Sequence, residues 1–538
     1  MMLAGTGKVA INLCRRHEPN FCLSCNHASM LAVVNCATVF GIDAIPIQVE
    51  VDIANGLPGF ATVGLPENTV KEARVRVQAA ISNSDYLFPN GKITVNLAPA
   101  HLRKDGTGFD FPIALGILAA QGLIPIERLA KTFVLGELSL SGQVRPVRGV
   151  LAAAQIAFEQ GCKCMLVAKE NGAEAALVEG LEVRTVETFR DAAQYLVTED
   201  ERRAPVAKPQ TLEPNLEFEL DLADVRGQYQ ARRALEIAAA GGHNLIMIGG
   251  PGSGKTMMAR CLPSILPPLH HTQALEVTRI HSAAGLTLSS GGLIQQRPFR
   301  APHHSMTRAG LIGGGNGVPR PGELSLATHG VLFLDELPEF SRNVLEVLRQ
   351  PLESGEVVLS RANATLRYPA KIMLVAAMNP CPCGNYGSPR KKCRCSMIDI
   401  TRYKSRLSGP LLDRIDLHIE VPPVDLVALQ TSSPGESSEV VMQRVCQARD
   451  AQKARLGESK LNGNMSKSQL VQTATPTLAG QRLLGMAVER LGLSARAYDR
   501  VLRVARTIAD LAGSTVVDSP HVGEAIQYRG DERMLLAA

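Results

Sequence analysis

A glycine-rich run carries the clearest chemistry in the sequence. Eight residues fit the pattern G-x-x-x-x-G-K-T: Gly249, Gly250, Pro251, Gly252, Ser253, Gly254, Lys255 and Thr256. An apolar run, Asn244–Ile248, precedes them and a helical run, Met257–Leu262, follows, as the pattern requires. Glycines let backbone N–H groups close around phosphate oxygens, while Lys255 should reach the β- and γ-phosphates and the Thr256 hydroxyl should bind Mg²⁺. The run therefore predicts a site for ATP and Mg²⁺.

Polar side chains also follow two later apolar runs. Asp335 and Glu336 come directly after four consecutive apolar residues, which are typical of a buried parallel strand. Because open α/β sheets bind ligands at the carboxyl ends of their strands, we expect Asp335 to hold the Mg²⁺ shell and Glu336 to orient or deprotonate the attacking water. Asn379 closes the apolar run Ile372–Ala377 and could position the water or sense the γ-phosphate. The alternative for Asn379 is a turn-forming residue before a proline.

A cysteine pattern indicates a second kind of site. Two C-x-C pairs stand nine residues apart and contain Cys381, Cys383, Cys393 and Cys395. Four thiolates in one loop can make a tetrahedral site, for which zinc is the favoured metal. Four protein ligands leave no open position, so the pattern predicts a structural Zn²⁺ rather than a catalytic one. Reduced free thiols are the alternative.

Composition and periodicity predict the elements that position these residues. A chain of 538 residues is too long for one core, and three or four units are expected. Strands alternate with helices in residues 30–197 and again in 220–421, which predicts two α/β domains. A proline-rich linker, 198–219, separates them, and the second contains the Cys-rich loop 381–395. The remaining part, 422–538, is expected to be mostly helical.

The ends and the overall composition bear on location and partners. Residues 1–29 show neither the alternation of a strand nor the apolar stripe of a helix, and they are interpreted as an N-terminal extension that is either a mis-assigned start or a disordered tail. The sequence has no apolar stretch of about 18 residues and no secretory signal, so we expect no membrane partner and a cytoplasmic location. Its twelve cysteines should then be reduced or metal-bound. The net charge of +6 permits contact with nucleic acid without arguing for it.

Longer motifs indicate a family. Four segments are much more specific than the glycine-rich run: Phe299–Ser305, Pro319–Ser325, Asn379–Gly384 and Ser408–Asp416. With them, the chain resembles the YifB/ComM family of magnesium-chelatase-like AAA+ ATPases from about Met30 to its C-terminus. The resemblance implies an N-terminal Lon-protease-like domain of the ribosomal protein S5 domain 2-like fold. It also implies a P-loop AAA+ core with a parallel sheet, a C-terminal helical lid, and a homo-hexameric ring with ATP bound between subunits.

The resemblance also implies roles for three side chains. Asn379 would be sensor 1, Arg414 an arginine finger acting in trans, and Arg496 sensor 2. A guanidinium can offset charge that develops on the transferred phosphoryl group. The alternative for Arg414 is a local ion pair with Asp413 or Asp416.

The N-terminal domain is not expected to be a peptidase. The Lon-type site needs a nucleophilic serine and a lysine base. The corresponding segment Lys104–Asp110 has no serine, with Thr107 its only hydroxyl, and Leu151 falls at the place of the lysine. DNA binding or ring organisation is the prediction instead, and an ordinary solvated face is the alternative. The basic candidates in this domain are Lys71, Arg74, Arg76, Arg103 and Lys104.

DNA is the predicted substrate of the motor. A hairpin expected over Glu356–Lys371 would carry Arg361 and Arg367, and the cysteine loop adds Arg390, Lys391, Lys392 and Arg394. Such residues could hold phosphates without regard to base sequence, or could instead face solvent or neighbouring subunits. The favoured hypothesis is a hexameric branch-migration helicase or translocase of the ComM type, in recombination or natural transformation. The alternative is a magnesium-chelatase-like or protein-remodelling ATPase, although the chelatase ATPase subunit lacks a Lon-like domain.

Overall fold

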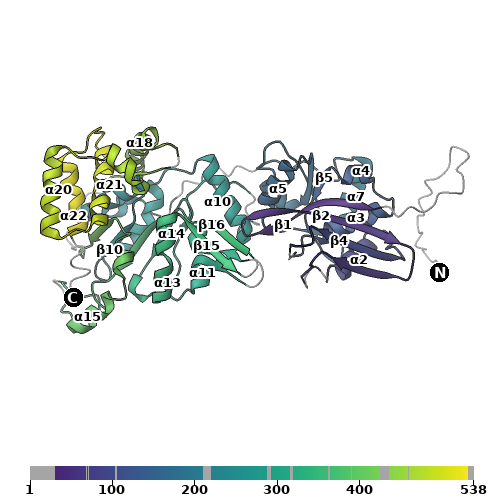
Figure 1. Ribbon diagram of the computed structural model, residues 1–538, viewed down its shortest axis with the longest axis horizontal. Helices are drawn as coiled ribbons and strands as arrows, with labels where there is room; N and C mark the ends of the chain where they lie inside the picture. Colours follow the sequence, from purple (N-terminus) through teal and green to yellow (C-terminus); the bar gives the residue numbers. More distant parts are fainter. Residues whose placement is uncertain are drawn as a thin grey trace, which may run out of the picture.

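The computed structural model arranges the chain as an elongated series of three parts (Figure 1). It describes residues 31–67, 70, 72–102, 104, 106–209, 218, 220–287, 292–315, 319–361, 364–388, 391–423, 435–458 and 460–530. The extension 1–29 lies outside these ranges. Two α/β units come first, and helices form the end that is opposite the N-terminal domain. None of the helices in the described residues has the length and apolar character needed to cross a bilayer.

The N-terminal part is a sheet of seven strands in the order β3-β4-β2-β1-β5-β8-β9. Long antiparallel pairing joins β1 to β2 and β2 to β4, and the other neighbours are parallel. Alternate residues of β1 and β2 are buried, and α3 is buried along nearly its whole length. The elements are β1 Ala32–Phe40, β2 Asp43–Ala54, β3 Gly59–Val63, α2 Ala73–Asn83, β4 Lys92–Ala98, α3 Asp110–Ala120, α4 Ile126–Leu129, β5 Thr132–Val134, β6 Glu137–Leu138, β7 Val144–Arg145, α5 Val150–Glu159, β8 Cys164–Ala168, α6 Lys169–Ala175, β9 Glu182–Val186 and α7 Phe189–Thr198.

The middle part is built on a parallel sheet of five strands in the order β11-β14-β17-β10-β18. Its strands are short and apolar because helices cover them. The elements are η1 Leu222–Asp224, α8 Tyr229–Gly241, β10 Leu245–Ile248, α9 Lys255–Cys261, η2 Leu262–Ile265, α10 His271–Ala284, β11 Phe299–Arg300, α11 Arg308–Ile312, β12 Gly313–Gly314, β13 Arg320–Pro321, α12 Glu323–Leu326, β14 Val331–Leu334, η3 Leu337–Glu339, α13 Arg342–Val347, α14 Arg349–Ser354, β15 Glu356–Arg361, β16 Ala364–Pro369, β17 Met373–Met378, α15 Met397–Lys404, α16 Gly409–Leu412 and β18 Leu417–Glu420.

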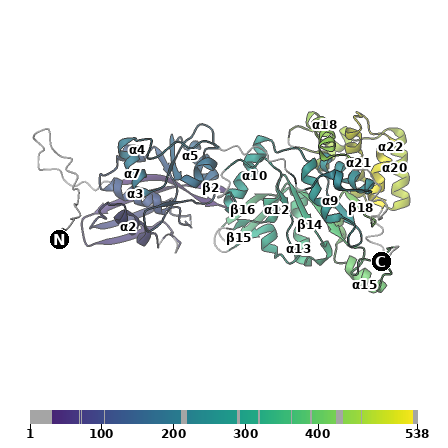
Figure 2. The ribbon, with the colours of Figure 1, turned by 180° about the vertical axis from the view of Figure 1, so that it is seen from behind.

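The C-terminal part is helical, as the sequence predicts, and Figure 2 shows it from behind, beyond α9 and β18. Its elements are α18 Ser438–Leu456, η4 Asn462–Asn464, α19 Lys467–Thr473, α20 Leu478–Leu491, α21 Ala495–Leu511 and α22 Ser519–Gly530. Buried residues of α18 and α21 share one apolar cluster with α8 and β10. The lid and the sheet therefore have a common core.

The predicted hairpin is present as β15 and β16, but it packs against the N-terminal domain. Leu366 and Tyr368 of β16 share a buried cluster with Ile42, which lies in the turn between β1 and β2. A Cβ atom on Gly41 would lie 3.2 Å from the side chains of Leu366 and Tyr368, so the two elements are in close contact. One face of the hairpin is therefore buried against the domain that precedes it.

A buried carboxylate joins the lid to the sheet. Asp416 is 2% exposed and accepts hydrogen bonds from the His243 ring at 3.2 Å and from the backbone N–H of Asn244 at 3.3 Å. Arg500 of α21 forms an ion pair with its other oxygen. Burial acts to raise the pKa of Asp416, but the charge of Arg500 and the His243 hydrogen bond outweigh it and hold that pKa well below its usual range.

Replacing Asp416 with Asn should therefore loosen the lid. The change leaves Arg500 without its counter-charge, and breaking a buried ion pair costs about 3 kcal/mol. Native-state hydrogen exchange of the α21 amides would measure the loss. In the control Asp413→Asn, the altered carboxylate has a weak partner, the exposed Arg496 at 3.8 Å. This change should alter the free energy of opening by about 0.5 kcal/mol or less. Equal protection of the α21 amides in the wild type, Asp416→Asn and Asp413→Asn would contradict this role of Asp416.

Candidate functional site

The glycine-rich run forms a loop between β10 and α9, with Lys255 as the first residue of the helix. Gly252 and Gly254 have φ angles of +74° and +89°, a region that glycine adopts without steric cost. The Lys255 ammonium is 8% exposed and donates to the carbonyls of Gly249 at 2.7 Å and Gly250 at 2.9 Å. Burial lowers the pKa of Lys255, and the nearby carboxylates of the acidic pair oppose that shift. The amine is thus held at the loop, where phosphate oxygens would replace the carbonyls.

The acidic pair lies at the same edge of the sheet. β14 pairs with β17 and β17 pairs with β10, all in parallel, so their carboxyl ends meet. The Thr256 hydroxyl donates to Asp335 Oδ2 at 2.7 Å. A hydroxyl and a carboxylate side by side are the hard oxygen ligands that Mg²⁺ takes, so the donor set fits the predicted ion. Glu336 follows with φ +52°, and its backbone N–H donates to Asp335 Oδ1 at 2.9 Å.

Asn379 completes this edge. It leaves β17 directly after Met378, and its Oδ1 accepts from the Lys255 ammonium at 3.3 Å. The structure thus brings Lys255, Thr256, Asp335 and Asn379 together at one edge, with Glu336 beside them. The side chain of Asn379 faces the glycine-rich loop Gly249–Thr256, called the phosphate loop from here on. A residue that served only to form a turn would not need to face it.

Arg414 and Arg496 lie at the other end of the strands. Both line a cavity of about 570 Å³ that also includes Asn244, the residue before β10. Arg414 pairs with Glu353 and donates to the Pro410 carbonyl at 2.7 Å. The local partners considered for Arg414 pair with other arginines, because Asp413 lies 3.8 Å from Arg496 and Asp416 pairs with Arg500 of α21. Neither arginine faces the phosphate loop of its own chain.

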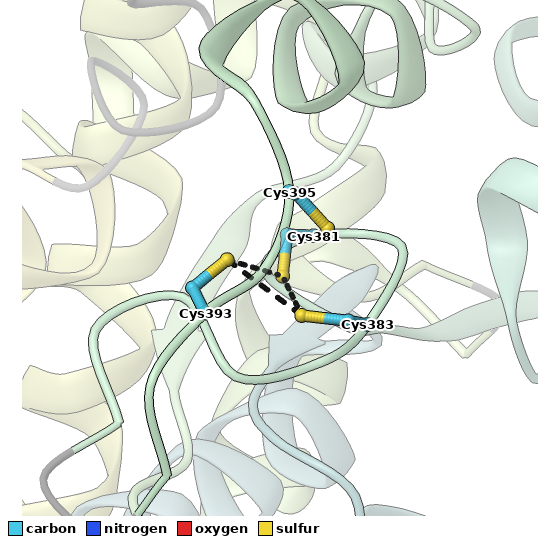
Figure 3. Close-up of side chains that lie close together, drawn as sticks. All are labelled: Cys381, Cys383, Cys393 and Cys395. Atoms are coloured by element: carbon cyan, nitrogen blue, oxygen red, sulfur yellow. Dashed lines mark hydrogen bonds between the residues drawn. The ribbon is translucent and has the colours of Figure 1, made fainter.

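The four cysteines of the predicted metal site converge in the loop after β17 (Figure 3). The Sγ atom of Cys381 lies 3.4 Å from that of Cys383 and 3.7 Å from that of Cys393, and Cys383 and Cys393 are 3.6 Å apart. All four sulfur atoms, including that of Cys395, lie within 4.8 Å of one another. A tetrahedral zinc ion with Zn–S bonds of about 2.3 Å needs sulfur atoms roughly 3.8 Å apart, so the cluster fits zinc.

The DNA candidates fall into different environments. Lys391, Lys392 and Arg394 are exposed on the cysteine loop. Arg367 is exposed but pairs with Glu356 at 3.1 Å. The side chains of Arg361 and Arg390 lie outside the described residues.

Two of the basic candidates in the N-terminal domain are not free to bind DNA. Lys104 is fully buried and donates to the Gly64 carbonyl at 2.9 Å, and Arg76 is bound to Asp110 at 2.6 Å. Both the DNA interpretation and the solvated-face alternative are therefore wrong for Lys104, because its ammonium satisfies buried carbonyls. Arg74 is exposed. Lys71 and Arg103 lie outside the described residues.

The positions relevant to peptidase chemistry are occupied in other ways. The Thr107 hydroxyl donates to the Glu137 carboxylate. Leu151 is fully buried in α5, where the Lon pattern would have its lysine. Neither position offers a nucleophile paired with a lysine base.

His304 is a residue of this site that the sequence patterns do not assign. Its Nδ1 lies 3.3 Å from Glu336 Oε2. The ring stands 4.0 Å from that of His303 and meets Phe340 edge-on at 6.4 Å. It follows β11, the strand beside β14. The motif Phe299–Ser305 contains it, and its place in that specific motif was the available signal.

Comparisons with known proteins cover nearly the whole chain. Families described as "Magnesium chelatase, subunit ChlI" and "Magnesium chelatase, subunit ChlI C-terminal" match residues 221–429 and 435–529, and one described as "Subunit ChlI of Mg-chelatase" matches 49–171. "Competence protein ComM" of Haemophilus influenzae is 45% identical over 510 residues, which cover 94% of this chain and 98% of that protein. "Uncharacterized protein YifB" of Escherichia coli is 44% identical over 512 residues, with the same coverage of both chains. A magnesium-chelatase 38 kDa subunit of Cereibacter sphaeroides is 27% identical over 172 residues, 29% of this chain and 51% of its own.

The roles of Lys255 and Glu336 can be separated by substitution. Lys255→Ala should weaken ATP binding, because the ammonium that would meet the phosphates is gone. Glu336→Gln should keep ATP bound but lower kcat by about 10²–10⁴-fold, because an amide cannot accept the proton of the attacking water. The control is Glu339→Gln, which alters an exposed carboxylate paired with Arg406. Equilibrium binding of a fluorescent ATP analogue and steady-state hydrolysis measure the two effects, and normal turnover by Glu336→Gln would contradict its role.

Substitution of His304 should affect turnover more than binding. His304→Ala removes the group that faces the Glu336 carboxylate, so kcat should fall about tenfold while KM for ATP changes little. His304→Asn retains an N–H donor and should recover part of the rate. In a Glu336→Gln background, His304→Ala should cost almost nothing more, because residues that act as a unit are not additive. A full additional loss in that background would show that His304 acts elsewhere.

Proposed function

Because the chain belongs to the YifB/ComM family of magnesium-chelatase-like AAA+ ATPases, we propose that it couples ATP hydrolysis to the remodelling of DNA. The proposed form is a homo-hexameric ring in the cytoplasm that acts as a branch-migration helicase or translocase in recombination or natural transformation. The observation that carries the ATPase part is the meeting of Lys255, Thr256 and Asp335 at one sheet edge. The relative named a competence protein supports DNA as the substrate class.

Each side chain at the edge has a role in hydrolysis. Lys255 and the loop N–H groups would bind the β- and γ-phosphates, and Thr256 and Asp335 would hold Mg²⁺. Bound magnesium would neutralise charge on the phosphate oxygens. Glu336, whose carboxylate is half-exposed beside the loop, would take the proton of the attacking water. Asn379, already bonded to Lys255, would contact the γ-phosphate or that water.

The two arginines support a ring. Arg414 and Arg496 lie at the amino ends of the strands, whereas the phosphate loop lies at the carboxyl ends. A head-to-tail contact between copies, of the kind that closes into rings, would bring one chain's arginines to the next chain's nucleotide. Arg414 would then be the arginine finger and Arg496 sensor 2, both supplied by the neighbour. Exchange of the Arg414–Glu353 ion pair for a phosphate contact would accompany ATP binding.

Exposed cations near the nucleotide site are the proposed DNA contacts. Lys391, Lys392 and Arg394 lie on the cysteine loop, in which Cys381, Cys383, Cys393 and Cys395 would hold a structural Zn²⁺. Three further candidates are Arg367, which is exposed on the β15–β16 hairpin, and Arg361 and Arg390, whose side chains lie outside the described residues. Contacts of this kind hold phosphates without reading sequence.

A magnesium-chelatase-like or protein-remodelling ATPase is the second candidate. The match of residues 49–171 to a family described as a chelatase subunit favours it, since the N-terminal domain was expected to separate this chain from chelatases. Against it, the chelatase 38 kDa subunit aligns with only 29% of this chain, whereas the competence protein aligns with 94%. The DNA proposal is therefore preferred.

DNA should stimulate ATP hydrolysis, most strongly in one of three forms: single-stranded, duplex or four-way junction. The stimulation should fall steeply between 50 and 200 mM salt, because phosphate contacts release counterions, at a cost of about 10³–10⁵ in affinity for six to ten contacts. Replacement of Lys391, Lys392 and Arg394 by alanine should reduce the stimulation and the salt dependence while leaving the basal rate unchanged. The matched control replaces three other exposed lysines, Lys131 and Lys163 of the N-terminal domain and Lys208 of the linker. Stimulation by a protein or porphyrin partner, with none by DNA, would favour the second candidate.

A further inference from the structure

The cysteine cluster begins beside the nucleotide site. Cys381 stands two residues after Asn379, the side chain that contacts Lys255. The cluster occupies the connection from β17 to α15, so the same strand leads into both sites. Any change in the course of this loop starts at the residues that face the phosphate loop.

Donors within the loop are directed at the sulfur atoms. The backbone N–H of Tyr386 donates to Cys381 Sγ at 3.3 Å, and the Asn385 amide lies 3.8 Å from Cys383 Sγ. Hydrogen bonds of this kind orient metal ligands and stabilise thiolates. Three of the sulfur atoms lie 3.4–3.7 Å apart and all four lie within 4.8 Å of one another, so these donors indicate a built metal site rather than a chance group of thiols (Figure 3).

The loop also packs directly on the phosphate loop. A Cβ atom on Gly384 would lie 2.5 Å from Cδ and 2.7 Å from Cγ of the Pro251 ring, and one on Gly250 would lie 3.2 Å from the Gly384 carbonyl. The Gly384 N–H donates to the Cys381 carbonyl at 2.9 Å, so its position is tied to the first metal ligand. The backbone at Cys383–Gly384 thus forms a wall against the middle of the phosphate loop.

Within its described residues, the cysteine loop has little buried apolar surface. Only Cys381 of the four cysteines is buried, and the others are partly exposed. Lys391, Lys392 and Arg394 are exposed and contribute no core packing. A metal bound by the four cysteines would therefore add substantially to the contacts that hold the described part of this loop in one conformation.

We propose that the four cysteines bind one structural zinc ion and that this ion, by fixing Gly384 against Pro251, holds the phosphate loop and Asn379 in the arrangement that hydrolyses ATP. Zinc occupancy thereby controls the ATPase rate. The ion itself touches no phosphate, since its four positions are filled by sulfur. The inference rests on the proposed ATP and zinc sites and is independent of the proposal that DNA is the substrate.

The first test is the metal. Elemental analysis of the purified full chain should give one zinc ion per chain, and Cys395→Ser should lose it. The ATPase rate of Cys395→Ser should fall at least tenfold, whereas the control Cys446→Ser, an isolated thiol, should keep both zinc and rate. Absence of zinc from the wild-type protein would overturn the proposal, as would full activity in Cys395→Ser after loss of its zinc.

The second test isolates the contact from the metal and does not depend on the cysteine variants folding. Gly384→Ala should keep zinc but lower kcat about tenfold or more, because its Cβ meets the proline ring. Gly387→Ala is the matched control: both glycines have φ +76°, but a Cβ on Gly387 would meet nothing within 4 Å. The two variants therefore carry the same backbone strain, and equal rates would overturn the role of the contact.

Failure of the underlying assignment has a different signature. If the wild-type protein binds zinc but neither binds nor hydrolyses ATP, the ATP site is wrong. If it hydrolyses ATP and Gly384→Ala matches Gly387→Ala, only the coupling between the loops is wrong. A result in which DNA fails to stimulate the wild type, but Gly384→Ala still lowers the basal rate, would leave the inference supported and remove DNA alone.

Discussion

The parallel pairing of β10 with β17, and of β17 with β14, is the constraint on which the rest of the structure depends. Ile248 is the register partner of Met378, so the phosphate loop and Asn379 leave the sheet at the same level. Leu334 is the partner of Ala376, which brings the acidic pair to the same edge. Backbone hydrogen bonds between three strands therefore set the positions of side chains from three distant segments. A slip by one residue in either pair would turn these side chains to opposite faces.

The two edges of this sheet divide the chemistry. The carboxyl edge holds the phosphate loop, the acidic pair and the wall formed by the cysteine loop. The amino edge holds Arg414, Arg496 and the buried ion pair of Asp416 with Arg500, which joins the lid to the sheet. Arg414 and Asp416 are separated by one residue, so the proposed arginine finger lies beside the ion pair that joins the lid to the sheet. An assembly in which the amino edge of one chain meets the carboxyl edge of the next would link the lid of one subunit to hydrolysis in its neighbour.

The positions of residues that directly follow a strand could be predicted from the local sequence. The glycine-rich loop, Asp335 and Asn379 each follow an apolar strand, so their position at a sheet edge could be predicted from pattern alone. The hairpin and the cysteine cluster could also be predicted, because each is formed by residues that lie close together in the sequence. Contacts between distant segments could not be predicted. Glu353 is 61 residues from Arg414 in sequence, and only the packing of α14 beside the strand edge makes them partners.

The same limit applies to buried charge. Lys104 has the appearance of a surface cation in the sequence, and its burial depends on carbonyls at Gly64 and Pro99 that only the fold brings near. The strand before His304 is just two residues long, too short for its pattern to predict a neighbour of Glu336. Contact of Gly384 with Pro251 likewise joins loops that share no sequence pattern.

Complementation between two inactive variants tests most directly whether one chain's arginines complete the nucleotide site of the next. Lys255→Ala lacks the residue proposed to bind ATP, and Arg414→Ala lacks the residue proposed to be supplied to the neighbour. In randomly mixed rings, roughly a quarter of the interfaces would pair an intact Lys255 with an intact Arg414, so ATPase activity should reappear on mixing. Steady-state hydrolysis after equimolar mixing and reassembly should exceed the sum of the separate rates. A mixture no more active than its components would contradict the account.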